Sequence, residues 1–419
     1  MNVWLVKTGE PIPSDGENVR LMRMGILAKH LSDEGHQVIW WNAKFNHSSK
    51  LFRTIKSPIK ISKNLKIQLL NSSGYKKNVS LKRLVLDHTQ LANNFKTLAK
   101  QEEKPDIILA SFPTIGLSLA SVKFGQKNNI PVVVDLRDLW PEAFLDSFPN
   151  FSKTLIKGIL TPMYSKAKYT LSNATGLVGI SQPFLDWGLK MAGRQKSNFD
   201  AVFPFGYKKV AANQKTNNLN EFPFLNTNND NKIFTFCYIG NLSYNLNLKP
   251  IAEALASLKD KSIKFQFIIC GRGVALKDFE TLFKDFDNVH FTGFINASQI
   301  ATIMQYTDLG IVPYVNTPNF QKTISNKVVE YLAGALPIIT SITGYMGPYL
   351  KKHNSGITYN SSNELVEHLQ KLSAHREQLA QMKKNALELY EKNFKAENVY
   401  SNFTNHLKNI VESNNKNSK

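Results

Sequence analysis

The chain has 419 residues, too many for one ordinary hydrophobic core and suited to two domains of about 200 residues each. Its 42% apolar and 11% aromatic content is that of a folded globular protein and excludes a disordered one. The net charge of +20 predicts an anionic partner, such as a membrane surface, a lipid diphosphate or a nucleic acid.

No stretch of about 18 apolar residues occurs, and no basic segment precedes a long apolar run near Met1. We therefore expect neither a transmembrane helix nor a signal peptide, and we expect the protein to stay in the cytoplasm.

The first half alternates short apolar runs with helical stretches, which is the pattern of a doubly wound α/β fold. Because the runs are continuous and not alternating, they predict a parallel sheet that is covered on both faces. A helix is predicted over residues 17–34. The predicted strands are residues 2–6, 37–41, 65–70, 106–110, 131–135 and 176–180.

Basic residues concentrate between Lys44 and Lys100, where Asp87 is the one acidic residue. This segment indicates an anionic surface, and a solvated basic face that only aids solubility is the alternative. Residues 153–173 form a second basic segment with apolar residues at helical spacing. Such a helix suits either a membrane interface or ordinary core packing with extended lysines.

After a segment rich in Asn and Lys, the alternation restarts. We predict a first domain over residues 1–208, a linker over 209–232, and a second Rossmann-like domain over 233–390. A last helix over 391–412 would pack back on the first domain, and a polar tail over 413–419 would be disordered. Strands of the second domain are predicted at residues 233–239, 264–270, 288–292, 308–312, 337–340 and 356–359.

Residues 323–337 carry the most informative motif, Thr-Ile-Ser-Asn-Lys-Val-Val-Glu-Tyr-Leu-Ala-Gly-Ala-Leu-Pro. Ser325 is a good N-cap for a short helix. The first turn of that helix, with Asn326 and Lys327, presents backbone amides and a positive dipole end to a phosphate. Glu330 lies one turn further along, where a carboxylate can accept hydrogen bonds from ribose hydroxyls. An ordinary amphipathic helix is the alternative.

The pattern Asn-Lys-x-x-Glu-Tyr-Leu-x-Gly-x-x-Pro of residues 326–337 resembles the nucleotide-binding segment of family 4 glycosyltransferases, the retaining GT-B enzymes. In that family the Glu that matches Glu330 holds the ribose of the donor nucleotide. Residues 135–142 are similar to a segment of the subgroup that builds bacterial surface polysaccharides. Three further segments resemble glycine turns of the donor domain, namely residues 238–242, 270–273 and 291–294.

The resemblance implies a GT-B fold with two Rossmann-like, doubly wound parallel-sheet domains facing a central cleft, and it places Gly240 and Asn241 in the donor site. The chain departs from the family where Lys322 replaces a frequent second Glu. It also has Asn241 where many members have an Arg. We therefore expect Arg272 and Lys327 to neutralise the diphosphate.

Two groups of residues in the first half are candidates for contacts with phosphate or acceptor. Ser14 and Gly16 lie in the loop after the first strand, where small residues before a helix suit such contacts. Asp135, Arg137 and Asp138 follow a buried strand and are the candidate catalytic residues, with an ion pair that orders the loop as the alternative. The dispersed histidines predict no metal site.

Together with these observations, the resemblance implies a retaining hexosyl- or N-acetylhexosaminyltransferase that uses a UDP- or GDP-linked sugar as substrate, with no cofactor or metal. The acceptor would be a polyisoprenyl-diphosphate-linked or other saccharide in capsule or O-antigen synthesis, reached at the inner face of the cell membrane on an anionic surface. A nucleotide-sugar epimerase with the same fold is one alternative. A basic nucleic-acid-binding protein is another, but no nucleic-acid-reading motif accompanies the charge, so we expect no nucleic acid as a partner.

Overall fold

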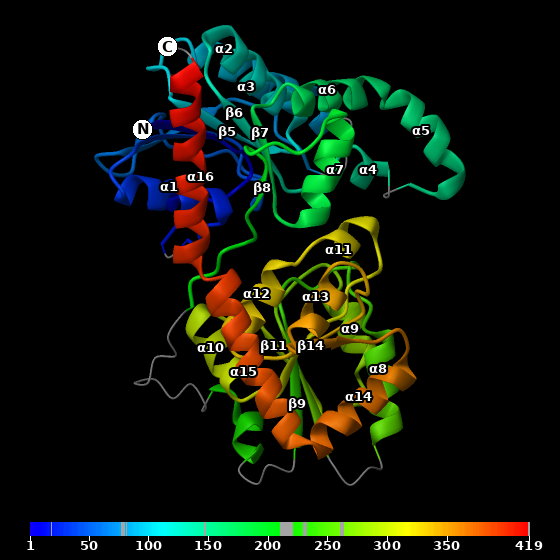
Figure 1. The fold of residues 1–419 in the computed structure, drawn as a ribbon. Helices are drawn as coiled ribbons and strands as arrows, with labels where there is room; N and C mark the ends of the chain where they lie inside the picture. Colours follow the sequence, from blue (N-terminus) through cyan, green and yellow to red (C-terminus); the bar gives the residue numbers. More distant parts are fainter. Residues whose placement is uncertain are drawn as a thin grey trace. The chain divides into compact units, whose positions relative to one another are not determined.

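The structure is a computed structural model that describes residues 1–17, 19–76, 80, 82–145, 148–209, 221–228, 233–259 and 264–417. The chain divides into two compact units (Figure 1). Unit 1 comprises Met1–Pro204 and Val399–Lys419, and unit 2 comprises Phe205–Asn398. Most of the predicted linker, residues 210–220 and 229–232, lies outside the described residues.

Unit 1 is built on a sheet that has eight strands among the described residues, in the order β3-β4-β2-β1-β5-β6-β7-β8. All neighbours in it are parallel except β3 and β4. The strands are β1 (Asn2–Val6), β2 (Gln37–Ala43), β3 (Ile59–Lys60), β4 (Leu65–Leu70), β5 (Ile107–Phe112), β6 (Val132–Leu136), β7 (Gly176–Gly179) and β8 (Ala201–Val202). The predicted parallel α/β sheet is therefore present.

The helices of unit 1 are α1 (Arg23–Asp33), α2 (His88–Leu98), α3 (Ile115–Asn128), α4 (Glu142–Leu145), α5 (Lys153–Ile159), α6 (Thr161–Ser172), α7 (Gln182–Ala192) and the greater part of α16 (Ala396–Asn417). Short irregular helices occupy Pro13–Asp15, Lys82–Asp87 and Asn150–Ser152. The last helix packs on unit 1, where Phe403 stacks on Phe203 at 4.4 Å between ring centroids.

Three predictions about the helices of unit 1 need correction. The helix predicted over residues 17–34 begins at Arg23, because the carboxylate of Glu10 binds the backbone N–H groups of Met24 and Gly25 and so caps the helix there. The helix predicted over residues 153–173 is broken into α5 and α6 next to Pro162. The tail predicted to be disordered from residue 413 continues α16 as far as Asn417.

Unit 2 has a sheet of six strands among the described residues, in the order β11-β10-β9-β12-β13-β14, and all of its pairs are parallel. The strands are β9 (Ile233–Ile239), β10 (Lys264–Cys270), β11 (Val289–Gly293), β12 (Leu309–Val312), β13 (Ile338–Thr340) and β14 (Gly356–Thr358). The helices are α8 (Lys249–Leu258), α9 (Leu276–Leu282), α10 (Ala297–Gln305), α11 (Pro318–Lys322), α12 (Asn326–Ala333), α13 (Met346–Lys352), α14 (Ser362–Ala374) and α15 (Arg376–Asn393), with a short 3-10 helix at Pro223–Asn228.

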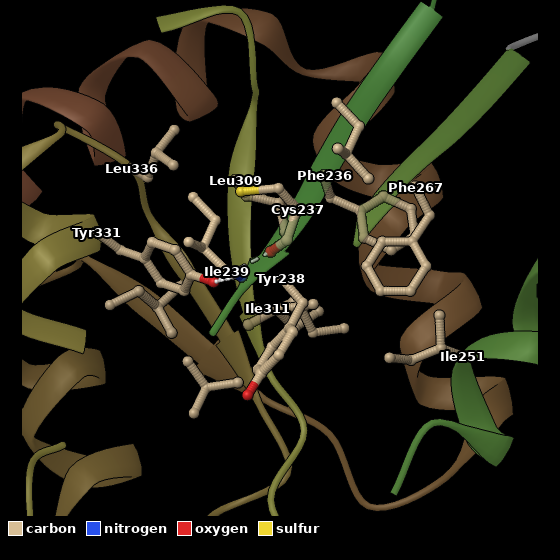
Figure 2. Close-up of a cluster of buried hydrophobic side chains, with 14 of the residues drawn as sticks. Phe236, Cys237, Tyr238, Ile239, Ile251, Phe267, Leu309, Ile311, Tyr331 and Leu336 are labelled. Carbon is tan, nitrogen blue, oxygen red and sulfur yellow. Dashed lines mark hydrogen bonds between the residues drawn. The ribbon is translucent and has the colours of Figure 1, made fainter. Parts of the chain in front are cut away.

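The core of unit 2 joins α12 to the central strand β9 (Figure 2). The hydroxyl of Tyr331 accepts a hydrogen bond of 2.8 Å from the backbone N–H of Ile239 and donates to the carbonyl of Cys237 at 3.4 Å. The Tyr331 ring lies against Gly310 of β12, where a Cβ atom would come within 2.5 Å of it. These contacts fix the position of α12 relative to the carboxyl end of β9.

Within the described part of the chain, no helix combines the length and the apolar character that crossing a membrane requires.

Candidate functional site

Three glycine turns lie side by side at one edge of the unit 2 sheet. They follow β9, β10 and β11, whose last residues are paired as Ile239 with Cys270 and Cys270 with Gly293. The backbone N–H of Gly240 donates to the carbonyl of Cys270, and that of Gly271 donates to the carbonyl of Gly293, both at 2.7 Å. This is the carboxyl edge of a parallel sheet, where ligands bind in open α/β folds.

The close approach of these turns requires glycine at position 271. A Cβ atom on Gly271 would lie 1.8 Å from the carbonyl oxygen of Gly240, and the residue has a φ of +138°. The backbone fixes the position of the Cβ atom, and the carbonyl oxygen is itself part of the backbone. No side-chain rearrangement can therefore relieve the clash.

Gly271→Ala is expected to separate the first two turns, lower the free energy of unfolding of unit 2 by about 1–3 kcal/mol, and abolish nucleotide binding. Gly193→Ala is the matched control, because Gly193 also has a positive φ, +68°, but has nothing within 4 Å of the new Cβ. The control should lose only about 1 kcal/mol and keep nucleotide affinity. Calorimetric titration with UDP and GDP measures the difference, and full affinity in Gly271→Ala would contradict the role of the turn.

Helix α12 brings a lysine onto the first of these turns. The Lys327 Nζ donates to the carbonyl of Ile239 at 2.7 Å and lies 5.0 Å from the ring centroid of Tyr238. A Cβ atom on Gly240 would lie only 1.3 Å from this Nζ, so the ammonium group lies directly on the glycine turn. Lys327 and Gly240, which the sequence analysis assigned separately to the donor site, are therefore neighbours.

The N-terminus of α12 lies where the sequence predicts it. Ser325 is the N-cap residue with extended backbone angles, although its hydroxyl makes no capping hydrogen bond. Asn326 in the first turn is exposed, and Glu330, one turn further along, is only 6% exposed. Such a helix start offers its first amides and its positive dipole end to an anion.

Asn241 on the first turn and Arg272 on the second turn complete this group. Both are exposed, and the Nε of Arg272 lies 4.0 Å from where a Cβ of Gly293 would be. Unit 2 therefore brings together the predicted donor-site residues on two neighbouring turns and α12. These residues are Gly240, Asn241, Arg272, Ser325, Asn326, Lys327 and Glu330. Two cations and a helix N-terminus beside narrow glycine turns can bind a phosphate.

The candidate catalytic residue Asp135 is placed differently from the prediction. It is fully buried, and its two oxygens accept hydrogen bonds from Nε and Nη2 of Arg23 at 3.2 and 3.1 Å. We therefore assign Asp135 a structural role, in which it fixes the start of α1 to the end of β6. This is the ion pair that remained as the alternative, although its partner is Arg23 and not the neighbouring Arg137.

Arg137 and Asp138 belong to a charged cluster after β6. Arg137 binds the carboxylate of Glu10. Burial opposes the charge of the Arg137 guanidinium, but Glu10 and Asp135 together hold its pKa above the usual value. Asp138 is half-buried in the same cluster, close enough to Lys7 to favour its charged form. The sequence analysis missed Lys7, Glu10 and Arg23, although a charged residue after a strand or at a helix start is a visible signal.

Lys7 is expected to titrate far below an ordinary lysine. Burial and, after it, the positive charge of Arg137 lower its pKa to about 8, while Glu10 and Asp138 oppose the shift. The pKa of Lys7 is lower in the folded state than in the unfolded state, so the charged ammonium group destabilises the folded protein. This destabilisation is complete below pH 8, and the free energy of unfolding rises as the pH increases from about 8 toward 10.5. In a ¹³C NMR titration of reductively methylated protein, one lysine signal should titrate near pH 8. That signal should be absent from Lys7→Met, and its absence from the wild type would contradict this assignment.

Ser14 and Gly16, the remaining candidates, lie in an exposed loop of unit 1. Asp15 between them binds Arg53 at 2.6 Å, and Arg53 also donates to the carbonyl of Ala43. The loop is thus held in place by one of the basic residues that the sequence analysis assigned to an anionic surface.

The comparison with protein families matches one part of the chain. Residues 220–389, which include the described strands and turns of the candidate site, match the family model of glycosyl transferases group 1. No curated protein matches the chain by sequence.

Solved structures match both units. The chain is similar to sucrose-phosphate synthase from Thermosynechococcus elongatus, with a TM-score of 0.73 and 14% identity over 98% of this chain and 99% of that one. It is similar to HepE from Anabaena in complex with UDP, with a TM-score of 0.66 and 13% identity over 98% and 100%. It also resembles WaaG, a glycosyltransferase involved in lipopolysaccharide biosynthesis, with a TM-score of 0.61 and 14% identity over 95% and 98%.

The class that the fold defines is therefore that of the GT-B proteins, as the sequence analysis predicted. The match of residues 220–389 to the glycosyl transferases group 1 model, together with this fold, supports a glycosyltransferase.

Proposed function

We propose that the protein transfers a sugar from a nucleotide-diphosphate sugar to a saccharide or lipid-linked saccharide acceptor. The observation that carries the proposal is the group of glycine turns, cations and helix N-terminus around Gly240, Lys327 and Glu330, inside the segment that the family model matches. The similarity to HepE, whose structure contains UDP, supports a nucleotide as the ligand of this group.

In this proposal each element of unit 2 has a separate task. Glu330 accepts hydrogen bonds from the ribose hydroxyls, and the first amides of α12 meet the diphosphate. Arg272 and Lys327 stabilise the negative charge that grows on the leaving diphosphate, which is the largest electrostatic demand of the reaction. These residues would meet the demand without a metal or another cofactor.

The stereochemistry and the acceptor are part of the same proposal. We expect retention of configuration, with the leaving phosphate helping to remove the proton of the acceptor hydroxyl. We expect the donor sugar to be a hexose or an N-acetylhexosamine. The acceptor would belong to bacterial surface polysaccharide synthesis, in capsule or O-antigen, and would be met by a cytoplasmic protein at the inner face of the cell membrane. The similarity to WaaG supports such an acceptor.

A thermal-shift screen over UDP- and GDP-linked sugars tests the proposal. A ligand present at 100 times its Kd stabilises the folded state by about 2.7 kcal/mol, so the true donor should raise the melting temperature by several degrees. Incubation of that donor with extracted lipid-linked saccharides should then release the nucleoside diphosphate. No shift with any nucleotide-sugar would contradict the proposal, and conversion of the donor to an isomer without acceptor would replace transfer by epimerisation.

A further inference from the structure

Helix α5 and the turn before it expose a row of large apolar side chains. Phe151, Leu155 and Ile159 are 90%, 72% and 64% exposed, and their spacing of four residues places them along one side of the helix. None of the α5 residues is buried, and Figure 1 shows α5 projecting from the rest of unit 1. An apolar row of this kind on an exposed helix marks an interaction site.

The segment that carries this row has only positive charges. From Phe148 to Leu185 the chain has no acidic residue, and its lysines are Lys153, Lys157, Lys166 and Lys168. Lys157 is exposed and Lys153 is half-buried, so both belong to the same short helix as the apolar row. An apolar face bordered by lysines is the pattern of a helix that lies in the interface of an anionic membrane.

A second apolar and basic patch lies on two other segments of unit 1. Its exposed apolar residues are Leu51, Phe52, Ile55, Val85 and Leu86, at 67%, 50%, 40%, 58% and 53%. Exposed lysines Lys56 and Lys82 accompany them. The single acidic residue of this part of the sequence, Asp87, is buried and accepts a hydrogen bond from the N–H of Gly74. The exposed part of this patch is therefore also positive.

A chain of side-chain contacts connects the two patches. Phe52 meets Phe45 at 5.3 Å, and Phe45 meets Tyr75 at 4.9 Å between ring centroids. The Arg83 guanidinium lies 4.8 Å from the Tyr75 ring and 5.5 Å from the ring of Trp140.

Further side-chain contacts lead from Trp140 toward α5. Trp140 meets Phe144 at 5.9 Å, and Phe144 meets Phe148 at 5.2 Å, three residues before Phe151. The three segments also lie at the same edge of the sheet. Residues 50–56, residues 82–86 and α5 follow the carboxyl ends of the parallel strands β2, β4 and β6, respectively. Both patches thus belong to the same edge of the unit 1 sheet.

Two histidines in contact with these aromatic side chains, His47 beside Tyr75 and His88 beside Trp140, do not add to the positive charge. The pKa of His47, which shares a hydrogen bond of 2.6 Å with the Tyr75 hydroxyl, is lowered to about 4 by burial and then by the charges of Lys50 and Arg83. Burial and the charge of Arg83 lower the pKa of His88 to about 3. Both imidazoles are neutral at pH 7, which leaves lysine and arginine as the cations that meet an anionic surface.

We propose that residues 50–56, residues 82–86 and helix α5 form one docking surface that lays unit 1 on an anionic bilayer. This inference rests on the proposed function, since it supplies the surface through which a sugar transferase would reach a lipid-linked acceptor. The apolar side chains enter the boundary between headgroups and acyl chains, and the lysines lie among the anionic headgroups. Charge complementarity and the continuity of the two patches favour a membrane over a second copy of the chain.

The first experiment reverses charge on α5. Flotation of the full chain with vesicles of phosphatidylcholine and phosphatidylglycerol in equal parts measures binding. The double variant Lys153→Glu/Lys157→Glu is expected to bind roughly 30-fold more weakly. The matched control is Lys127→Glu/Lys190→Glu, which makes the same change of charge on exposed residues near the ends of α3 and α7, at the opposite edge of the sheet. The control should bind to within about threefold of the wild type, and equal loss in both variants would show that only net charge matters and overturn the proposal.

The second experiment tests whether the exposed apolar side chains bind the membrane and whether both patches take part. Phe151→Ser/Leu155→Ser and Leu51→Ser/Leu86→Ser each remove exposed side chains, so neither should lower the melting temperature, and each should weaken flotation roughly tenfold or more. Normal flotation of either double variant would overturn the proposal of a shared surface.

Sedimentation distinguishes a membrane from a second copy of the chain. If the wild type is a dimer that Phe151→Ser/Leu155→Ser converts to monomers, with flotation unchanged, the surface belongs to a second copy of the chain. All variants should keep the thermal shift with nucleotide-sugar, so a failure of donor binding and a failure of membrane docking are seen separately.

Discussion

Glu330→Ala is expected to lower the affinity of the protein for its nucleoside diphosphate by roughly 100-fold. A hydrogen bond to a charged group contributes about 1.5–3 kcal/mol, so the loss of two bonds from ribose hydroxyls to one carboxylate removes about 3 kcal/mol or more. Glu330→Gln retains one acceptor oxygen and should lose roughly tenfold. Calorimetric titration with UDP or GDP, whichever stabilises the wild type, measures both changes.

The same experiment can separate a ribose contact from a phosphate contact. Inorganic diphosphate carries no ribose, so Glu330→Ala should bind it as well as the wild type does. Arg272→Ala should weaken the binding of the nucleoside diphosphate and of inorganic diphosphate alike, because it removes a positive charge that contacts the phosphates. Stability should change little in Glu330→Ala, because α12 is held in the core by Tyr331 and its apolar neighbours and alanine favours a helix. Unchanged affinity for the nucleoside diphosphate would remove Glu330 from the donor site.

Much of the candidate site in unit 2 could be predicted from the sequence because its signals are local. Ser325, Lys327 and Glu330 lie within six consecutive residues, and their helix starts where the N-cap residue indicates. The strands of both sheets were recognisable as continuous apolar runs, since a parallel sheet buried on both faces requires them. The two-residue strands β3 and β8 were missed because so short a segment carries no periodic pattern.

The interpretation of unit 1 was less accurate because its determining contacts connect distant residues. Glu10 caps α1 across a loop, and Arg23 meets Asp135 across 112 positions of the chain. No spacing rule relates such residues, so the sequence offered only the neighbouring Arg137 as an ion-pair partner for Asp135. Part of the basic segment from Lys44 to Lys100 also pairs with distant residues. Arg53 and Lys66 in it bind Asp15 and Glu102, so these two cations are neutralised within unit 1.

Arg23→Met is expected to destabilise unit 1 by about 3–5 kcal/mol. Arg23 and Asp135 have side chains that are 1% and 0% exposed, so loss of the guanidinium leaves a buried carboxylate without its counter-ion. The substitution also removes a hydrogen bond of 2.8 Å to the carbonyl of Pro204 and the contact of Arg23 with the ring of Phe403, at 5.2 Å. The start of α1, the end of β6 and the last helix would therefore loosen together.

Tryptophan fluorescence during urea unfolding can measure this loss in unit 1 alone, because the chain's five tryptophans, at positions 4, 40, 41, 140 and 187, all belong to that unit. Lys29→Met is the matched control, since Lys29 binds Asp33 at 2.8 Å on the same helix but both side chains are more than half exposed. It should change stability by less than about 0.5 kcal/mol. The double variant Arg23→Met/Asp135→Leu removes both charges and should recover part of the loss. If Asp135 instead contacts substrate, Asp135→Asn would abolish transfer while the tryptophan unfolding curve stays that of the wild type, and the structural role argued for this pair would be wrong.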